Sequence, residues 1–132
     1  MSTPPSLLMV NAFIGTANYK KLYQELGYAV VTEWSERKAI ALVRKSPPAV
    51  IVADFFHQTD FRDRLSNLES LLATAQASPS TRILVFYEAA HQAALDKVSA
   101  RLRIDAALTL PVQEDRLRAT LKAWLDAPAS AL

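Results

Sequence analysis

The stretch Ala49–Phe56, AVIVADFF, decides the fold. Its first five residues are apolar and rich in valine and isoleucine, which is typical of a strand buried on both faces of a sheet. Asp54 follows this predicted strand, Ala49–Ala53. A carboxylate at the carboxyl end of a central parallel strand lies where open α/β sheets place their ligand crevice. Asp54 is therefore the first candidate for a functional residue.

Other segments rich in β-forming residues predict four further strands. The run Tyr28–Glu33 is more polar than the rest, as an edge strand can be. The remaining three expected strands are Leu7–Asn11, Arg82–Tyr87 and Ala106–Leu110.

Between these strands, apolar residues recur at helical spacing. Gly27 stands where a left-handed helix cap belongs, Ser35 is a good helix N-cap, and Pro47 follows a helix end. Along the third helix, Phe61, Leu65, Leu68, Leu72 and Ala75 step by four and three. The five expected helices are Thr16–Leu26, Glu36–Lys45, one from about Asp60 to the Ser78–Ser80 turn, His91–Arg103 and Glu114–Leu125.

Strict alternation of strands and helices predicts right-handed βαβ crossovers and a parallel sheet covered on both faces. Five strands in this length favour the flavodoxin-like order 2-1-3-4-5. We therefore expect a single doubly wound α/β domain over residues 6–126, with flexible tails at 1–5 and 127–132.

Composition excludes several classes of protein. The 132 residues include no cysteine, which rules out disulfides and thiolate chemistry, and only two histidines. The 15 basic residues are interspersed with 13 acidic ones, so nucleic-acid binding is not expected. No run approaches a membrane span and the amino terminus does not read as a signal peptide, which predicts a cytoplasmic protein.

The chain resembles the receiver domain of bacterial response regulators over about Leu7–Leu125. The supporting marks are LLMVNA at 7–12, QELGYAVVTE at 24–33, PPAVIVAD at 47–54 and TLPV at 109–112. In that family, strand one ends in an acidic pair that holds Mg²⁺, and the strand-three aspartate accepts a phosphoryl group. Strand four ends in Ser or Thr, and strand five ends in Lys followed by Pro.

The resemblance assigns the phosphoacceptor position to Asp54, whereas the other functional positions do not match. Asn11 and Ala12 stand in place of the acidic pair, Tyr87 stands near the Ser/Thr position, and Leu110 replaces the lysine. Mg²⁺ prefers oxygen ligands including carboxylates, and phosphoryl transfer depends on positioning and charge neutralisation. We therefore expect a degenerate pseudo-receiver without a metal site or cofactor.

The segment after Asp54 departs furthest from the family, with Gln58 and Arg62 where a proline and a glycine are common. Exposed aromatic residues and arginines are enriched at interface hot spots, so this segment is a candidate recognition surface. Its residues would be Phe56, His57, Asp60 and Arg62. The alternative is a solvated first turn of helix three. A second candidate surface is the face of helix four, strand five and helix five, with Leu102, Ile104, Ala107 and Trp124.

The sequence thus predicts a non-enzymatic signal-transduction module that acts by binding a signalling protein or a second copy of itself. Two alternatives remain open. One is a working receiver that accepts phosphate on Asp54. The other is a flavodoxin-like protein that binds a small cofactor, for which the segment after strand one, with Gly15, is weak support.

Overall fold

The computed structural model describes residues 4–10, 19–55 and 68–126. Within them lies one five-stranded parallel sheet with the order β2-β1-β3-β4-β5, which confirms the predicted doubly wound topology. The strands are β1 (Ser6–Val10), β2 (Ala29–Glu33), β3 (Val50–Asp54), β4 (Arg82–Tyr87) and β5 (Ala106–Thr109). The helices are α1 (Lys20–Leu26), α2 (Glu36–Lys45), α3 (Glu69–Ala75), α4 (Gln92–Ser99) and α5 (Glu114–Asp126), with a 3-10 turn η2 (Ala89–His91) before α4.

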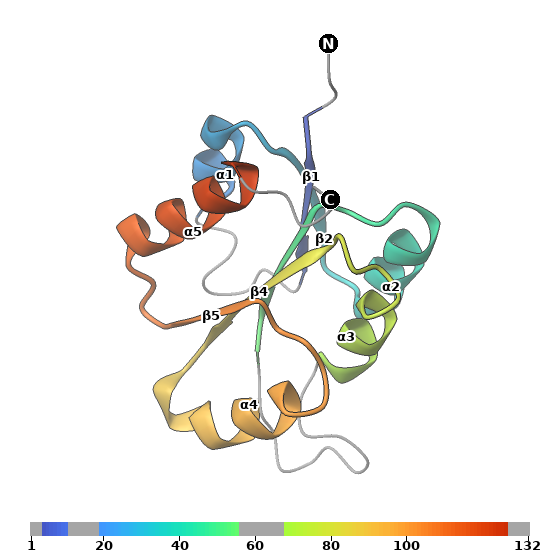
Figure 1. The fold of residues 1–132 in the computed structure, drawn as a ribbon, viewed down its shortest axis with the longest axis vertical. Helices are drawn as coiled ribbons and strands as arrows, with labels where there is room; N and C mark the ends of the chain where they lie inside the picture. The colour runs from blue at the N-terminus through green and yellow to red at the C-terminus, as the bar shows by residue number, and fades with distance from the viewer. Residues whose placement is uncertain (1–3, 11–18, 56–67, 127–132) are drawn as a thin grey trace.

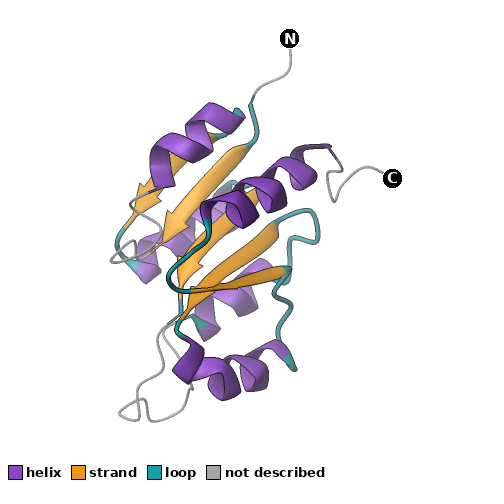
Figure 2. Ribbon diagram, turned by 90° about the vertical axis from the view of Figure 1, so that its left-hand side faces the viewer, coloured by secondary structure: helices purple, strands orange, loops and turns teal. Residues whose placement is uncertain are grey.

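Helices cover both faces of the sheet, with α1 and α5 on one side and α2 and α3 on the other (Figure 1; Figure 2 turns the sheet by 90°). Each face has its own apolar cluster. The first cluster lies beneath α2, α3 and α4 and includes Val43, Leu72 and Leu95. The second lies beneath α1 and α5 and includes Tyr23 and Leu121. The central strand β3 contributes alternate residues to both clusters, which is why its sequence is apolar throughout.

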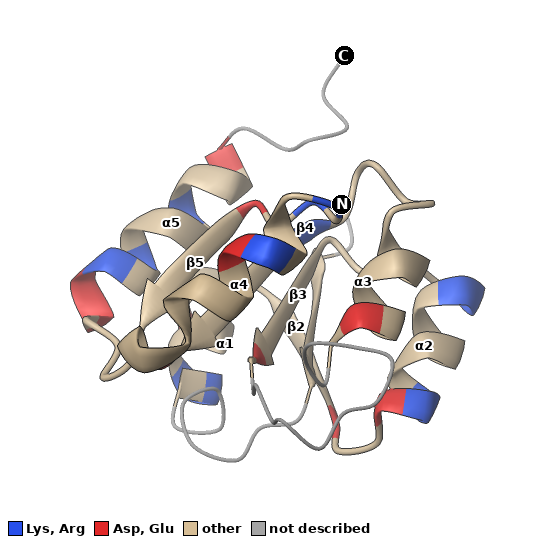
Figure 3. Ribbon diagram, turned by 90° about the horizontal axis from the view of Figure 1, so that it is seen from below, with Lys and Arg blue, Asp and Glu red and all other residues tan. Residues whose placement is uncertain are grey.

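Local chemistry sets the helix ends as predicted. The Ser35 hydroxyl oxygen accepts the Lys38 N–H at 3.3 Å and begins α2. Gly27 ends α1 with φ +108°, a left-handed conformation that favours glycine because it has no Cβ. Charges of both signs are interspersed along α2, α4 and α5 (Figure 3).

Three predicted boundaries are wrong in instructive ways. Strand β3 runs one residue further and includes Asp54, because Asp54 pairs with Phe86 of β4. Helix α4 ends at Ser99 and not at Arg103, because the Gln76 side chain binds both the N–H and the carbonyl of Arg103. Strand β5 ends at Thr109. The predicted starts of helices one and three lie outside the described residues.

Candidate functional site

The carboxyl end of the sheet positions the candidate acceptor. Asp54 closes β3 with only 1 % of its surface exposed, between the neighbouring strands β1 and β4. The next residue, Phe55, is also buried, and its N–H donates to the Phe86 carbonyl at 2.8 Å. Pairing with β4 thus fixes the backbone of Asp54 and Phe55, and the Asp54 side chain is buried.

Tyr87 ends the neighbouring strand β4 and is almost buried. Its hydroxyl donates to Gln92 Oε1 at 2.6 Å, and Gln92 Nε2 in turn donates to Asp96 Oδ1 at 2.9 Å. The phenol is therefore anchored to the first turns of α4.

Leu110 follows β5 and lies beside Tyr87. Its N–H donates to the Tyr87 carbonyl at 2.8 Å, and its side chain packs, partly buried, against the second apolar cluster. The Leu110–Pro111 peptide bond is cis. The residue that follows β5 thus has an uncharged side chain that contacts the apolar cluster.

Tyr23 of α1 contributes a buried phenol from the same side of the sheet as Leu110. It has no exposed surface, and its hydroxyl has no hydrogen-bond partner among the described residues. Burial raises the pKa of Tyr23 well above its ordinary value, and the Asp54 carboxylate and then Tyr19 raise it further. The phenol is therefore held in its neutral form close to the Asp54 carboxylate.

The aromatic lining continues through Tyr19 and Phe86. The two rings meet edge to face with centroids 6.3 Å apart, and the Tyr19 hydroxyl donates to the Val112 carbonyl at 3.4 Å. The residues around Asp54 in the described part of the chain are thus predominantly apolar or aromatic.

Several solved structures have the same architecture as this chain. The receiver domain of an HD domain-containing protein from Pseudomonas fluorescens superposes with a TM-score of 0.72 at 16% identity, covering 96% of this chain and 90% of that one. A receiver domain protein from Clostridium thermocellum gives 0.70 at 14% identity, covering 92% and 94%. A CheY-like receiver domain protein from Methanospirillum hungatei gives 0.68 at 16% identity, covering 94% and 95%. The fold is that of a signal receiver domain.

Sequence comparison adds no closer relative, because no family model and no curated protein matches the chain. Identities below 20% mean that the receiver likeness concerns the fold, and the function must be argued from this chain's own residues. Among the described residues, no helix is long and apolar enough to cross a bilayer.

The receiver fold brings three of the predicted site residues, Asp54, Tyr87 and Leu110, to the carboxyl ends of β3, β4 and β5. The other predicted residues lie outside the described part of the chain, and their roles remain predictions. They are Asn11 and Ala12, expected in place of the family's acidic pair, and Phe56, His57, Asp60 and Arg62 of the candidate recognition surface. Within the described ranges, no three His, Cys, Asp or Glu side chains gather as a metal site.

The predicted surface of helix four, strand five and helix five lies around the edge strand β5 and stays a prediction. Leu102 and Ile104 pack against the first apolar cluster, whereas Trp124 packs against the second on the opposite face of the sheet. Trp124 also lies beneath the Arg82 guanidinium, 5.5 Å from the ring centroid. This pair lines a hollow of about 510 Å³ with Pro5 and Tyr28, at the end of the sheet opposite Asp54.

Sequence reasoning missed the most exposed large apolar residues of the described chain, Val31 at 46 % and Trp34 at 59 %. Val31 lies on the edge strand β2 and Trp34 directly follows that strand. The signal was available, because a predicted edge strand that carries β-branched residues presents some of them to solvent.

Proposed function

We propose that this chain is a receiver-like signalling module that acts by binding another protein and has lost magnesium-dependent phosphoryl transfer to Asp54. The observation that carries the proposal is the placement of Leu110. Its backbone is bonded to Tyr87 at the carboxyl end of the sheet, yet its side chain belongs to the apolar cluster. A receiver that transfers phosphate has a lysine here to neutralise phosphoryl oxygens, and leucine supplies no charge.

Tyr87 supports the same conclusion. The corresponding Ser or Thr of a working receiver offers a small hydroxyl to the phosphoryl group. Here the hydroxyl is on a bulky ring and is engaged by Gln92 at 2.6 Å. Using it at Asp54 would require breaking a short, partly buried hydrogen bond.

The donor set does not fit Mg²⁺. A receiver binds the ion with several carboxylates, and Mg²⁺ favours hard oxygen ligands in near-octahedral geometry. At the corresponding positions this chain has one carboxylate, Asp54, with the neutral amide of Asn11 and the methyl group of Ala12. We therefore derive no step through magnesium.

Phosphorylation by a small donor tests this proposal directly. The protein is incubated with acetyl phosphate and Mg²⁺ and its intact mass is measured, with Asp54→Asn as the blank. We expect no phosphoryl adduct on the wild-type chain. A restored variant carrying Asn11→Asp, Ala12→Asp, Tyr87→Thr and Leu110→Lys is expected to gain an adduct that Asp54→Asn abolishes, provided circular dichroism shows that it is folded.

An adduct on the wild-type chain that Asp54→Asn removes would contradict the proposal and establish the alternative, a phosphorylatable receiver. Failure of the restored variant, if folded, would show that the lost groups alone do not explain the inactivity.

The protein-binding part of the proposal has its own experiment. The full chain is used as bait for partner capture, alone and with Phe56→Ala or Arg62→Ala in the predicted recognition surface. Arg44→Ala is a matched control, because Arg44 is exposed in the last turn of α2, at the end of the sheet opposite Asp54. We expect the first two variants to lose a partner that the control retains. Retention by all three would rule out this surface.

A further inference from the structure

The outer edge of β2 is an open strand edge. In the described part of the chain, β2 pairs only with β1, so its other side has no strand partner. Natural edge strands are commonly protected by lysine, proline, a bulge or extreme shortness. The sequence of β2, AVVTE, contains neither lysine nor proline and has its only charge at the end. The opposite edge strand, β5, is shorter, with four residues.

The backbone direction of β2 determines which groups are available. The Ala29 N–H donates to the Pro5 carbonyl at 2.8 Å, so Ala29 faces β1. Because strand residues alternate in the direction of their backbone groups, Val31 and Glu33 also face β1. Val30 and Thr32 therefore direct their N–H and C=O groups toward the open edge.

We propose that a second copy of this chain pairs antiparallel along β2, with a twofold axis at Val31. This register places Val30 opposite Thr32 of the partner subunit as a hydrogen-bonded pair, and the symmetry repeats that pair. Val31 then faces Val31 of the partner subunit as a non-hydrogen-bonded pair, the closer of the two pair types. Pairing centred on Val31 uses the whole length of β2 symmetrically.

The side chains beside Val31 supply an apolar centre for this interface. Val31 lines a shallow hollow of about 140 Å³ with Leu42 of α2 and Leu8 of β1. Val31 nevertheless has 46 % of its surface exposed, so the hollow is not closed within one copy. A second valine brought against it would bury apolar surface on both sides.

Charge complementarity favours an antiparallel arrangement of the two β2 strands. Helix α2 returns antiparallel to β2, and its last turn, with Lys45, lies at the same end of the sheet as Ala29. Glu33 lies at the other end of β2. A twofold axis at Val31 brings Glu33 of one copy to the end that carries Lys45 of the partner subunit. A parallel arrangement would instead place like charges together. The interface is isologous, as in most homodimers.

Sedimentation equilibrium of the full chain tests the inference. We expect a monomer–dimer equilibrium in the wild type and a dissociation constant about 100-fold higher or more for Val31→Lys, which sets two like charges face to face. Ala107→Lys on the exposed surface of β5 is the matched control and should leave the constant unchanged. Glu33→Lys and Lys45→Glu should each weaken the dimer, and their combination should restore it.

The concentration dependence of hydrogen exchange in the wild type supplies a second measurement, which does not depend on how well any variant folds. The Val30 and Thr32 amides should exchange slowly at high wild-type concentration and fast on dilution, and fast at both concentrations in Val31→Lys. A wild-type monomer at about 100 μM would overturn the inference. So would a dimer that Ala107→Lys dissociates and Val31→Lys does not. This inference does not depend on the state of Asp54, so its failure leaves the proposed function standing.

Discussion

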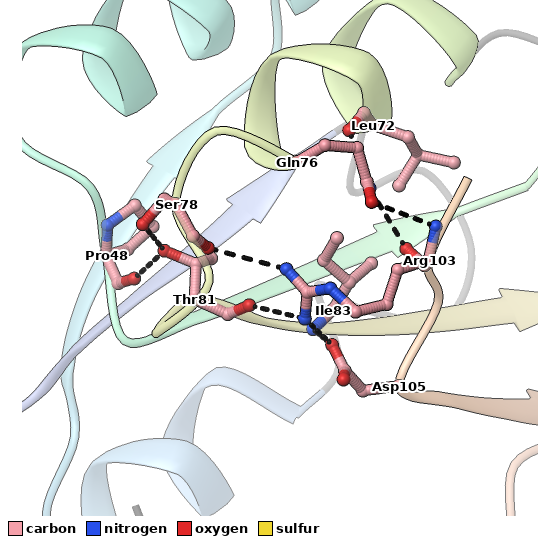
Figure 4. Close-up of polar contacts among 8 residues, drawn as sticks. All are labelled: Pro48, Leu72, Gln76, Ser78, Thr81, Ile83, Arg103 and Asp105. Atoms are coloured by element: carbon pink, nitrogen blue, oxygen red, sulfur yellow. Dashed lines mark hydrogen bonds and ion pairs between the residues drawn. The ribbon is translucent and has the colours of Figure 1, made fainter. Parts of the chain in front are cut away.

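The two ends of the sheet differ in what their polar groups do. At the amino end, Asp105 and Arg103 form a charged pair at 2.6 Å, and Arg103 also donates to the Thr81 carbonyl at 3.0 Å (Figure 4). At the carboxyl end, Leu110 and Tyr87 stand where a working receiver has a charged and a small polar side chain. Polar contacts at the first end hold loops together, whereas at the second end the Tyr87 hydroxyl bonds only to Gln92 of α4 among the described residues and Leu110 packs against an apolar cluster.

The amino-end network connects segments distant in sequence. Asp105 Oδ2 also accepts the Ile83 N–H at 2.7 Å, and the buried Thr81 hydroxyl donates to the Pro48 carbonyl at 2.7 Å. Gln76 binds the backbone of Arg103 on both sides. These bonds join the loops before β3, β4 and β5. The residues that hold the amino end of this fold are therefore different from the residues at its carboxyl end, so a change at the carboxyl end leaves this network intact.

The largest expected effect comes from breaking that network. Asp105→Ala removes the acceptor of two hydrogen bonds, one of them charge-assisted, and leaves the Ile83 N–H and Arg103 without it. We expect the free energy of unfolding in urea to fall by about 2–3 kcal/mol.

Asp115→Ala is the matched control for Asp105→Ala. Asp115 is exposed in the first turn of α5, where it stabilises the helix dipole by less than about 1 kcal/mol. Equal losses for the two variants would show that the network does not hold the amino end.

The effect of alkaline pH on stability compares a buried tyrosine at each end of the sheet, Tyr28 and Tyr23. Burial raises the pKa of Tyr28, near the amino end, to about 12, although Arg82 lowers it slightly. Burial and Asp54 raise the pKa of Tyr23 even further. A raised folded-state pKa gives stability that is complete below the unfolded value of about 10 and is lost as the pH rises above it.

The free energy of unfolding of the wild type should therefore fall between pH 10 and 12, by at most about 1.4 kcal/mol per pH unit for each tyrosine. Tyr23→Phe and Tyr28→Phe should each reduce this slope, as measured by urea unfolding at successive pH values. A slope that neither variant changes would mean that these phenols ionise freely in the folded protein.

The sequence predicted the scaffold better than the site for a physical reason. Apolar periodicity specifies strands and helices directly, so the sheet order, the Ser35 cap and the Gly27 cap were all predicted. Contacts that depend on tertiary placement were not. Nothing in the local sequence around Tyr23 indicates that its phenol lies beside Asp54, because only the packing of α1 on the sheet brings them together. The early end of α4 likewise depends on Gln76, 27 residues before Arg103.

The smallest expected effect comes from replacing each of two buried tyrosines, one at each end of the sheet, by phenylalanine. Both substitutions remove the same hydroxyl group, so their effects on stability can be compared directly. The Tyr28 hydroxyl donates to the Leu121 carbonyl at 2.8 Å, whereas the Tyr23 hydroxyl has no hydrogen-bond partner within residues 4–10, 19–55 and 68–126. At neutral pH, Tyr28→Phe should cost about 1 kcal/mol of unfolding free energy, and Tyr23→Phe should be neutral or stabilising. A loss of about 1 kcal/mol of unfolding free energy for Tyr23→Phe would contradict this, since it would mean that the Tyr23 hydroxyl makes a stabilising hydrogen bond. The Asp54 carboxylate would then be its first candidate partner, and the carboxyl end would retain a polar contact that packing alone does not explain.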